Sequence, residues 1–284
     1  EYYVGVGRAL EQWFALDGAR YEALGTDRKV YVYQGGDNQD ITPIRSTDAL
    51  VNAISTTTSS NIITITDTNH GAIQGDFVTL SSVSTDVAGI PAATLDAEYE
   101  ILSISNVDAY TIQSSATANA NTGPTANCTA NYQLNIGPNE QTFGYGWGAA
   151  TWNLSTWNTP RTTSQITLDA RLWSINNWGQ DLIITQKDGS TYEWLESGGM
   201  ASNRATVVAN APTNSTLSLV STETRHVVCM GTETSIGNVA TQDKMFIRWS
   251  DQENYNQWTP NVTNSAGSQR IAGGSEIRCA RPAK

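Results

Sequence analysis

Histidine and cysteine are scarce in this chain of 284 residues, which contains 2 His and 3 Cys. The cysteines Cys128, Cys229 and Cys279 lie far apart, and no pair of them forms a CxxC motif. Zinc sites and disulfide frameworks need closely spaced or even-numbered ligands, so this pattern disfavours both. We expect small, buried, reduced cysteines, no metal site and no cofactor.

Positive charge and long apolar runs are lacking as well. Lys and Arg number 16 against 27 Asp and Glu, which gives a formal net charge of −11. A surplus of acid repels phosphate and therefore disfavours tight binding to DNA or RNA. No apolar run approaches the length of a membrane span, and the N-terminus has no signal-peptide pattern. The first residue is Glu1 and the chain stops just after a strand-like run, so we expect a fragment.

No catalytic motif surrounds the two histidines, His70 and His226, since neither has a recognisable nucleophile pattern nearby. Carboxylates such as Asp181, Asp188 and Glu193 could pair in space as they do in glycosidases. Each of them also suits a turn or a solvated strand. We therefore expect no enzymatic activity.

Helical periodicity is nearly absent, whereas apolar residues alternate with period two between Gly, Thr, Ser and Asn punctuation. In residues 181–194, two such runs flank Asp188-Gly189, a pair typical of a tight hairpin turn. Residues 8–16, RALEQWFAL, are the one helical candidate and fit a strand equally well. The chain is predicted to be all-β.

Three segments repeat a strand that ends in an aromatic residue and a polar turn: residues 30–43, 190–199 and 245–260. Repeated antiparallel sheets with aromatics packed between them are typical of a β-propeller, which we expect to be incomplete in this chain. The aromatics expected to pack between the repeats are Tyr31, Tyr33, Tyr192, Trp194, Trp249 and Trp258.

Aromatics nearly vanish between residues 47 and 137, where Thr, Ser, Asn and Ala dominate. Two pairs of alternating strands in this range predict a small β-barrel inserted into a propeller loop. Such an insertion is tolerated because the cost of loop closure grows slowly with length. The expected domains are therefore residues 1–46 and 138–284 for the propeller and 47–137 for the insert.

The acid- and amide-rich loop after Trp249 has two interpretations. Asp251, Glu253 and Asn254 could bind calcium, but the ordered ligand spacing of a calcium loop is missing. Asp and Asn are also common in turns, because they hydrogen-bond nearby backbone. We favour the turn.

Two further stretches could contact other molecules. Residues 143–161 are rich in Gly and Trp, and their Trp147, Trp152 and Trp157 are candidate interface residues. A C-terminal group of cations could contact a phosphate or a neighbouring subunit, although a solvated strand edge explains it better. This group comprises Arg270, Arg278, Arg281 and Lys284.

The order of turns and aromatics resembles propeller-forming nozzle or tail tubular virion proteins of short-tailed double-stranded DNA bacteriophages. The likeness rests on KVYVYQGGDNQDITPIR, FGYGWGAATWN, WGQDLIITQKDGSTYEW and FIRWSDQENYNQWTP. The insert is similar, more weakly, to the first catalytic-cysteine half-domain of ubiquitin-activating enzymes, through ITITDTNHGAIQGDFVTL and GIPAATLDAEYEILSISNVDAYTI. That module would serve only as a scaffold here.

The resemblance implies a structural protein of the virion tail, assembled in the cytoplasm of a bacterial host. Copies would form a homo-oligomeric ring that lines or closes the DNA exit channel, with an adaptor or fibres as partners. An acidic wall would let genomic DNA pass without specific binding. The alternative is a glycan- or receptor-binding propeller module, in which several aromatic rings would lie exposed in one groove.

Overall fold

The computed structural model describes residues 3–140 and 169–281, and their regular structure is almost entirely antiparallel β-strand. This confirms the predicted all-β class. The helical elements in these residues are three single turns: α1 (Ala92–Leu95), η2 (Glu196–Gly198) and η3 (Val239–Thr241). None of the described helices is long and apolar enough to cross a membrane.

The chain forms two compact units, Glu1–Ile41 with Gly137–Lys284, and Thr42–Ile136. The second unit begins before residue 47, where the sequence pattern placed the start of the insert. Strand β5 (Ile44–Leu50) explains this difference, because it pairs with β13 (Cys128–Gln133) and so belongs with the insert.

The described residues of the first unit form three four-stranded antiparallel sheets, and in each the strands pair in sequence order. The first sheet consists of β1 (Gly7–Phe14), β2 (Arg20–Thr26), β3 (Val30–Gln34) and β4 (Asp37–Asp40). The second consists of β14 (Trp173–Trp178), β15 (Asp181–Gln186), β16 (Thr191–Trp194) and β17 (Thr206–Val207). The third consists of β18 (Leu217–Val220), β19 (Val227–Met230), β20 (Phe246–Trp249) and β21 (Gly267–Arg270).

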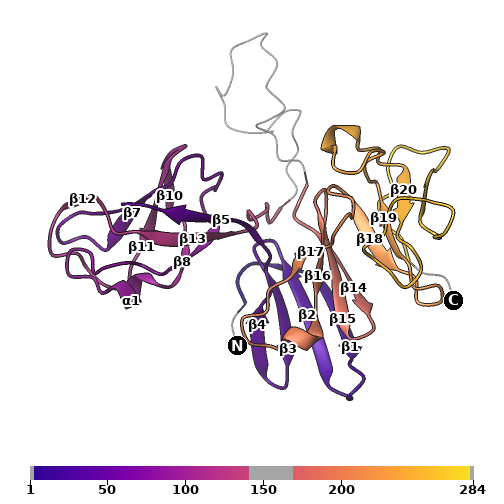
Figure 1. The fold of residues 1–284 in the computed structure, drawn as a ribbon, viewed down its shortest axis with the longest axis horizontal. Coiled ribbons are helices and arrows are strands. Elements are labelled where there is room, and N and C mark those ends of the chain that lie inside the picture. The colour runs from indigo at the N-terminus through magenta and orange to yellow at the C-terminus, as the bar shows by residue number, and fades with distance from the viewer. Residues whose placement is uncertain (1–2, 141–168, 282–284) are drawn as a thin grey trace, which may run out of the picture. The chain divides into compact units, whose positions relative to one another are not determined.

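The three sheets follow one another in space as they do along the chain (Figure 1). Their first strands are neighbours, since β14 contacts β1 on one side and β18 on the other. Four-stranded sheets that meet through their first strands agree with the expectation of an incomplete propeller, which the described residues do not close.

The helical candidate, residues 8–16, is a strand over residues 8–14, since β1 pairs with β2 there and the last two residues lie in the turn that follows. This pairing turns Trp13 inward, where it is buried, and leaves the next residue, Phe14, 69% exposed. The predicted Asp188-Gly189 turn is also confirmed, since it joins the paired strands β15 and β16. Asp188 has a φ of 54°, which an Asp tolerates better than most residues.

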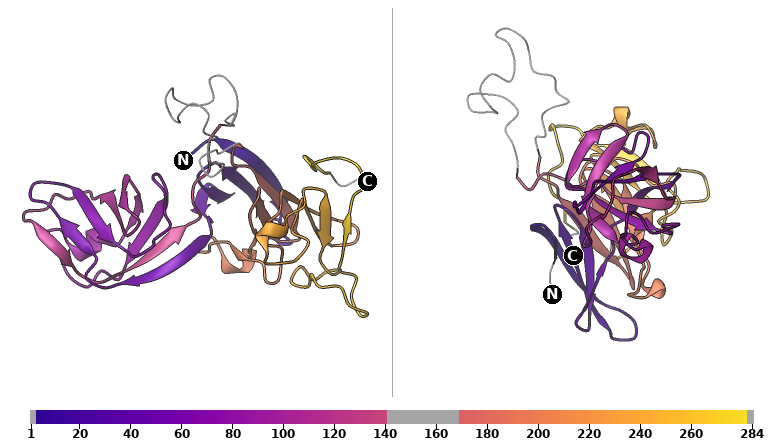
Figure 2. Two further views of the ribbon diagram at one scale, coloured as in Figure 1. Left: turned by 90° about the horizontal axis from the view of Figure 1, so that it is seen from above. Right: turned by 90° about the vertical axis from the view of Figure 1, so that its left-hand side faces the viewer.

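The second unit contains two sheets (Figure 2), and apolar side chains of both form one core. The five-stranded sheet has the order β10 (Ser103–Asn106), β11 (Ala109–Gln113), β7 (Ile62–Thr66), β6 (Ile54–Thr56), β12 (Thr122–Thr125). The four-stranded sheet has the order β5, β13, β8 (Phe77–Ser81), β9 (Glu98–Glu100). Among the described residues the strands thus form two separate ladders instead of the single closed ladder of the expected barrel.

Candidate functional site

The candidate interface residues Trp147, Trp152 and Trp157 lie outside the described residues. The predicted packing aromatics are all described: five lie in strands of the three sheets, and Trp258 lies in the loop that follows β20.

Trp194 packs between the first and second sheets and is fully buried. Its ring lies edge-on to Trp13 and Tyr21 of the first sheet, with ring centroids 6.3 and 5.9 Å apart. The Tyr21 hydroxyl donates to Glu196 at 3.0 Å. Burial, together with this hydrogen bond and the charge of Glu196, raises the pKa of Tyr21 to about 12. Tyr192 is also buried and lies two residues before Trp194, on the same face of β16.

Tyr31 and Tyr33 project from the opposite side of the first sheet. Their cross-strand partners on β2 are Leu24 and Glu22, whereas the alternate residue Tyr21 faces the second sheet. Tyr31 is buried and accepts a hydrogen bond from the Val4 backbone N–H at 3.0 Å. These two tyrosines therefore do not pack between the first and second sheets.

Trp258 packs between the second and third sheets, in the loop that follows β20. It is fully buried in a cluster with residues of both sheets, including Trp178, Ile183, Val227 and Cys229. Its indole N–H donates to the backbone carbonyl of Tyr255 at 2.6 Å, which fixes the turn.

Trp249 ends the third strand of its sheet, as Trp194 does, but it points away from the second sheet. Its partner on β19 is Val228, while the adjacent Cys229 contacts Thr191 of the second sheet at 3.6 Å. Trp249 is only partly buried, and its indole N–H donates to the Ser265 carbonyl at 2.8 Å. The expectation that this ring packs between two described sheets is therefore wrong.

An apolar surface surrounds Trp249, and we call it the outer face of the third sheet. Cross-strand pairing places its members on the side of the sheet that faces away from Cys229. No further sheet in the described part of the chain covers it. Its apolar members, all partly exposed, are Leu217, Leu219, Val228, Met230, Ile247 and Trp249.

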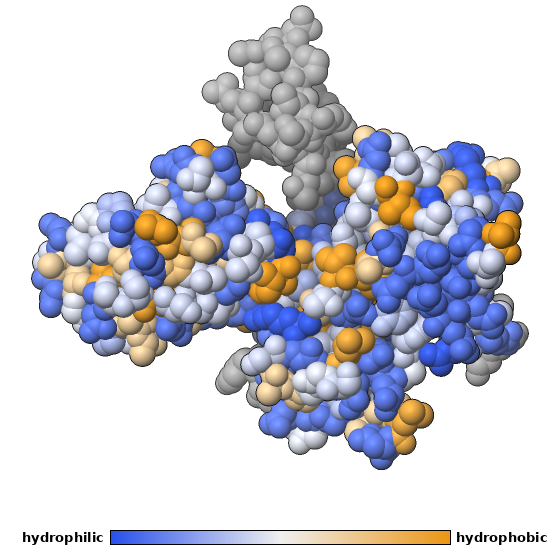
Figure 3. Space-filling view, viewed as in Figure 1, coloured by the Kyte–Doolittle hydropathy of each residue, from blue (hydrophilic) through white to orange (hydrophobic). Residues whose placement is uncertain are grey.

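The outer face of the first sheet carries Leu10, Leu24, Tyr31 and Tyr33, which share one side by the same pairing. Leu10 is 57% exposed. The neighbouring β1–β2 hairpin ends in an apolar patch (Figure 3), at which Phe14 and Leu16 are exposed. The two ends of the row of sheets thus both present apolar side chains.

The loop after Trp249 is held together by its own hydrogen bonds. The Asp251 carboxylate accepts from the Ser265 N–H at 2.8 Å, the Ser265 hydroxyl at 2.7 Å and the Gln252 N–H at 2.8 Å. The bonds from Ser265 lower the pKa of Asp251 most. Because this carboxylate closes the loop onto Ser265, the residues act as turn formers, and the described residues contain no cluster of three or more His, Cys, Asp or Glu side chains suited to a metal.

The two histidines lie in different units, and each makes a contact within its own unit. The ring of His70 is buried in the second unit and accepts from the Ala72 N–H at 3.0 Å. In the first unit, Nδ1 of His226 lies 2.9 Å from the Ser250 carbonyl oxygen. Neither contact belongs to a nucleophile–base pair.

Sequence reasoning missed three aromatics at the interface of the first and second sheets, Trp13 and Tyr21 of the first and Trp173 of the second. Trp13 stacks on Tyr21 with centroids 5.3 Å apart, and the Trp173 N–H donates to the Thr26 carbonyl at 2.6 Å. The alternation within residues 8–16 could have indicated Trp13, had that segment been assigned to a strand.

No family model matches the chain, and no curated protein matches it in sequence. Among solved structures it is similar to the phage phi92 endosialidase, with a TM-score of 0.28 and 11% identity. The match covers 94% of this chain and 38% of the endosialidase chain. A likeness of this size carries no argument about reaction, ligand or partner.

Proposed function

We propose that the chain is a structural component of a bacteriophage tail, in which identical copies form a nozzle or hub ring around the DNA exit channel. The observation that carries the proposal is the pair of apolar outer faces at the two ends of the row of sheets. Inside the row, faces of the same kind are buried against a neighbouring sheet. An exposed apolar sheet face favours association, because burial removes that surface from water.

The turns and aromatics resemble those of nozzle and tail tubular proteins, and this resemblance suggests that the copies associate in a virion tail. The ring belongs to the virion tail and is built in the bacterial cytoplasm, with an adaptor or fibres as further partners. Genomic DNA passes without specific binding, in keeping with the net charge of −11. A head-to-tail contact between unlike faces closes into a ring when the rotation between copies allows it. No reaction is proposed.

Immunolabelling of phage particles tests whether the chain is part of the tail. Antibodies raised against the purified chain should decorate the tails of the phage that encodes it, seen by immunogold electron microscopy. Purified particles that lack the chain by mass spectrometry would contradict the proposal.

Mutation of an outer face tests the contact itself. Ile247→Glu places a charge on the outer face of the third sheet and should lower the mass of the assembly, measured by light scattering. Val262→Glu is the matched control, since Val262 is fully exposed in a loop outside that face. Equal masses for the two variants would argue against the outer face as the contact.

The glycan-binding alternative requires exposed aromatic rings in one groove. Among the described tryptophans, only Trp249 is partly exposed, while Trp13, Trp173, Trp178, Trp194 and Trp258 are buried. The described tryptophans therefore favour the structural role.

A further inference from the structure

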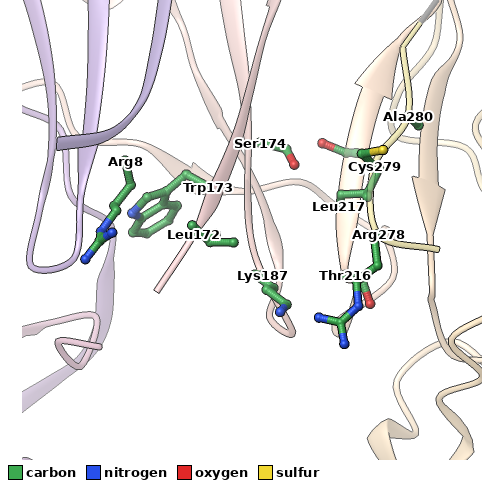
Figure 4. Close-up of a pocket in the computed structure, with 11 residues that line it drawn as sticks. Arg8, Leu172, Trp173, Ser174, Lys187, Thr216, Leu217, Arg278, Cys279 and Ala280 are labelled. Atoms are coloured by element: carbon green, nitrogen blue, oxygen red, sulfur yellow. The ribbon is translucent and has the colours of Figure 1, made fainter. Parts of the chain in front are cut away.

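A cavity of about 360 Å³ lies beside the first strands of the three sheets (Figure 4). Its wall includes Trp173 and Ser174 of β14 and Leu217 and Ser218 of β18. A volume of this order suits a small molecule.

The wall gathers positive charge in an otherwise acidic chain. Arg8 comes from β1, Lys187 from the turn between β15 and β16, and Arg278 from the C-terminal segment. None of the described residues that line this cavity carries a carboxylate. In Figure 4, Arg8 lies on one side of the cavity and Arg278 on the other, with its guanidinium directed toward the side where Lys187 lies.

Two buried polar atoms of the wall have no hydrogen-bond partner within the described residues. They are Oγ of Ser218 and Nε of Arg8. Ser218 is only 5% exposed, and its backbone carbonyl accepts from the Asn176 side chain at 3.2 Å, so its position is fixed by the second sheet. A buried hydroxyl without a partner destabilises a fold, which makes such atoms candidates for binding an unseen group.

Two of the cations also have acidic neighbours. Lys187 pairs with Asp169 at 2.7 Å, and Arg278 pairs with Glu276 at 2.7 Å. An ammonium group has three donors and a guanidinium five, so each cation retains capacity for a second acceptor. The two carboxylates therefore reduce the positive charge of the cavity wall, but Lys187 and Arg278 keep N–H donors for a ligand.

We propose that this cavity binds a small ligand through a phosphate or carboxylate group, which Lys187, Arg278 and the Ser218 hydroxyl contact. Arg8 would contact a second polar group at the other end of the cavity. The apolar wall formed by Trp173 and Leu217 would hold the remainder of the ligand. Leu217 belongs both to this cavity and to the outer face of the third sheet, but the binding proposed here does not require the ring and involves no reaction.

The first test is calorimetric titration of the whole chain with inorganic phosphate and, separately, with acetate, in Tris buffer at pH 7. Saturable heat with either anion supports the site, and the tighter of the two identifies the class of ligand group. Absence of saturable heat with both anions would mean that the cavity holds only water and would overturn the proposal.

Two variants locate the binding. Arg278→Gln and Ser218→Ala should each weaken the anion about tenfold or more, because each removes a donor to a charged group. Arg270→Gln is the matched control, since Arg270 pairs with Asp243 outside the cavity, and it should bind as the unaltered chain does. Unchanged affinity in both cavity variants would refute the assignment.

A stability measurement separates binding from folding. Without added anion, Ser218→Ala should have a melting temperature equal to or above that of the unaltered chain, because a methyl group replaces an unpartnered hydroxyl. With saturating anion the unaltered chain should gain melting temperature and the variant should gain less. A large loss without anion would show instead that Ser218 stabilises the fold itself and would contradict its role as a free donor.

Discussion

The indole rings of Trp13 and Trp194 meet edge to face, with centroids 6.3 Å apart and ring planes at 75°. Trp13 lies in the first strand of the first sheet and Trp194 in the third strand of the second. Aromatic pairs of this geometry contribute about 0.5–1.5 kcal/mol beyond the burial of their surface. The pair therefore joins two sheets that share no hydrogen-bonded ladder.

Trp194→Ala should lower the free energy of unfolding by about 3–5 kcal/mol, the usual cost of removing a fully buried large aromatic. Urea unfolding followed by circular dichroism measures the loss. Trp249→Ala is the matched control, because Trp249 occupies the same place in its own sheet but is partly exposed. Trp249→Ala should lower the free energy of unfolding clearly less than Trp194→Ala does. An equal decrease in the two variants would show that Trp249 is buried in solution.

Gly25→Ala should lower the free energy of unfolding by about 1–3 kcal/mol, because it overpacks the interface between the first and second sheets. A Cβ at Gly25 would lie 2.8 Å from Cδ1 of Trp173, whose N–H is held by the Thr26 carbonyl. The ring cannot move aside without losing that hydrogen bond. Thermal unfolding measures the effect.

Gly123→Ala is the control for this substitution, since a Cβ there meets nothing within 4 Å. It should leave the stability almost unchanged. If Gly25→Ala were equally neutral, the close approach of Trp173 to β2 would be disproved.

The sequence was sufficient to predict strands, a hairpin and the position of the repeated aromatics at the ends of strands, which the structure shows to be third strands. Tyr33, Trp194 and Trp249 do end, or nearly end, the third strands of their sheets. What the pattern could not determine was the direction in which each ring points. Trp194 faces the preceding sheet, whereas Trp249 faces away from it.

The reason is the period of a strand. A shift of one residue between a strand and the turn before it moves every side chain to the opposite face. In β20 this places Arg248, not Trp249, opposite Cys229 and toward the second sheet. The cavity of about 360 Å³ could not be predicted from the sequence either. Its residues Arg8, Ser218 and Arg278 are far apart in the sequence and come together only in the folded first unit.

Lys244→Met should raise the pKa of Asp188. Burial by itself raises this pKa, but hydrogen bonds from Lys244 and Gln242 outweigh it and hold the pKa of Asp188 below its ordinary value. The contribution of Asp188 to stability is therefore present above its unfolded pKa and is lost as the pH falls through the lower folded value. Without the ammonium group, burial is opposed chiefly by Gln242 and the more distant Lys187, so the folded pKa should move upward.

Carbon-13 NMR titration of the Asp188 carboxyl measures this shift. Arg270→Met is the control, because Arg270 pairs with Asp243 and makes no contact with Asp188. An unchanged pKa in Lys244→Met would show that Gln242 and the other neighbours suffice to hold the carboxylate.

The three thiols should differ sharply in reactivity toward a disulfide reagent at pH 8. Cys279 is exposed, whereas Cys128 and Cys229 are buried, and burial raises the pKa of each of these two to about 11. Since the thiolate is the reactive form, Cys279 alone should react quickly in the folded protein, and urea should release the other two. Cys279→Ser should abolish the fast phase seen by absorbance, with peptide mass spectrometry to identify the labelled residue. A fast phase that survives in this variant would mean that one of the sheets opens readily around Cys128 or Cys229.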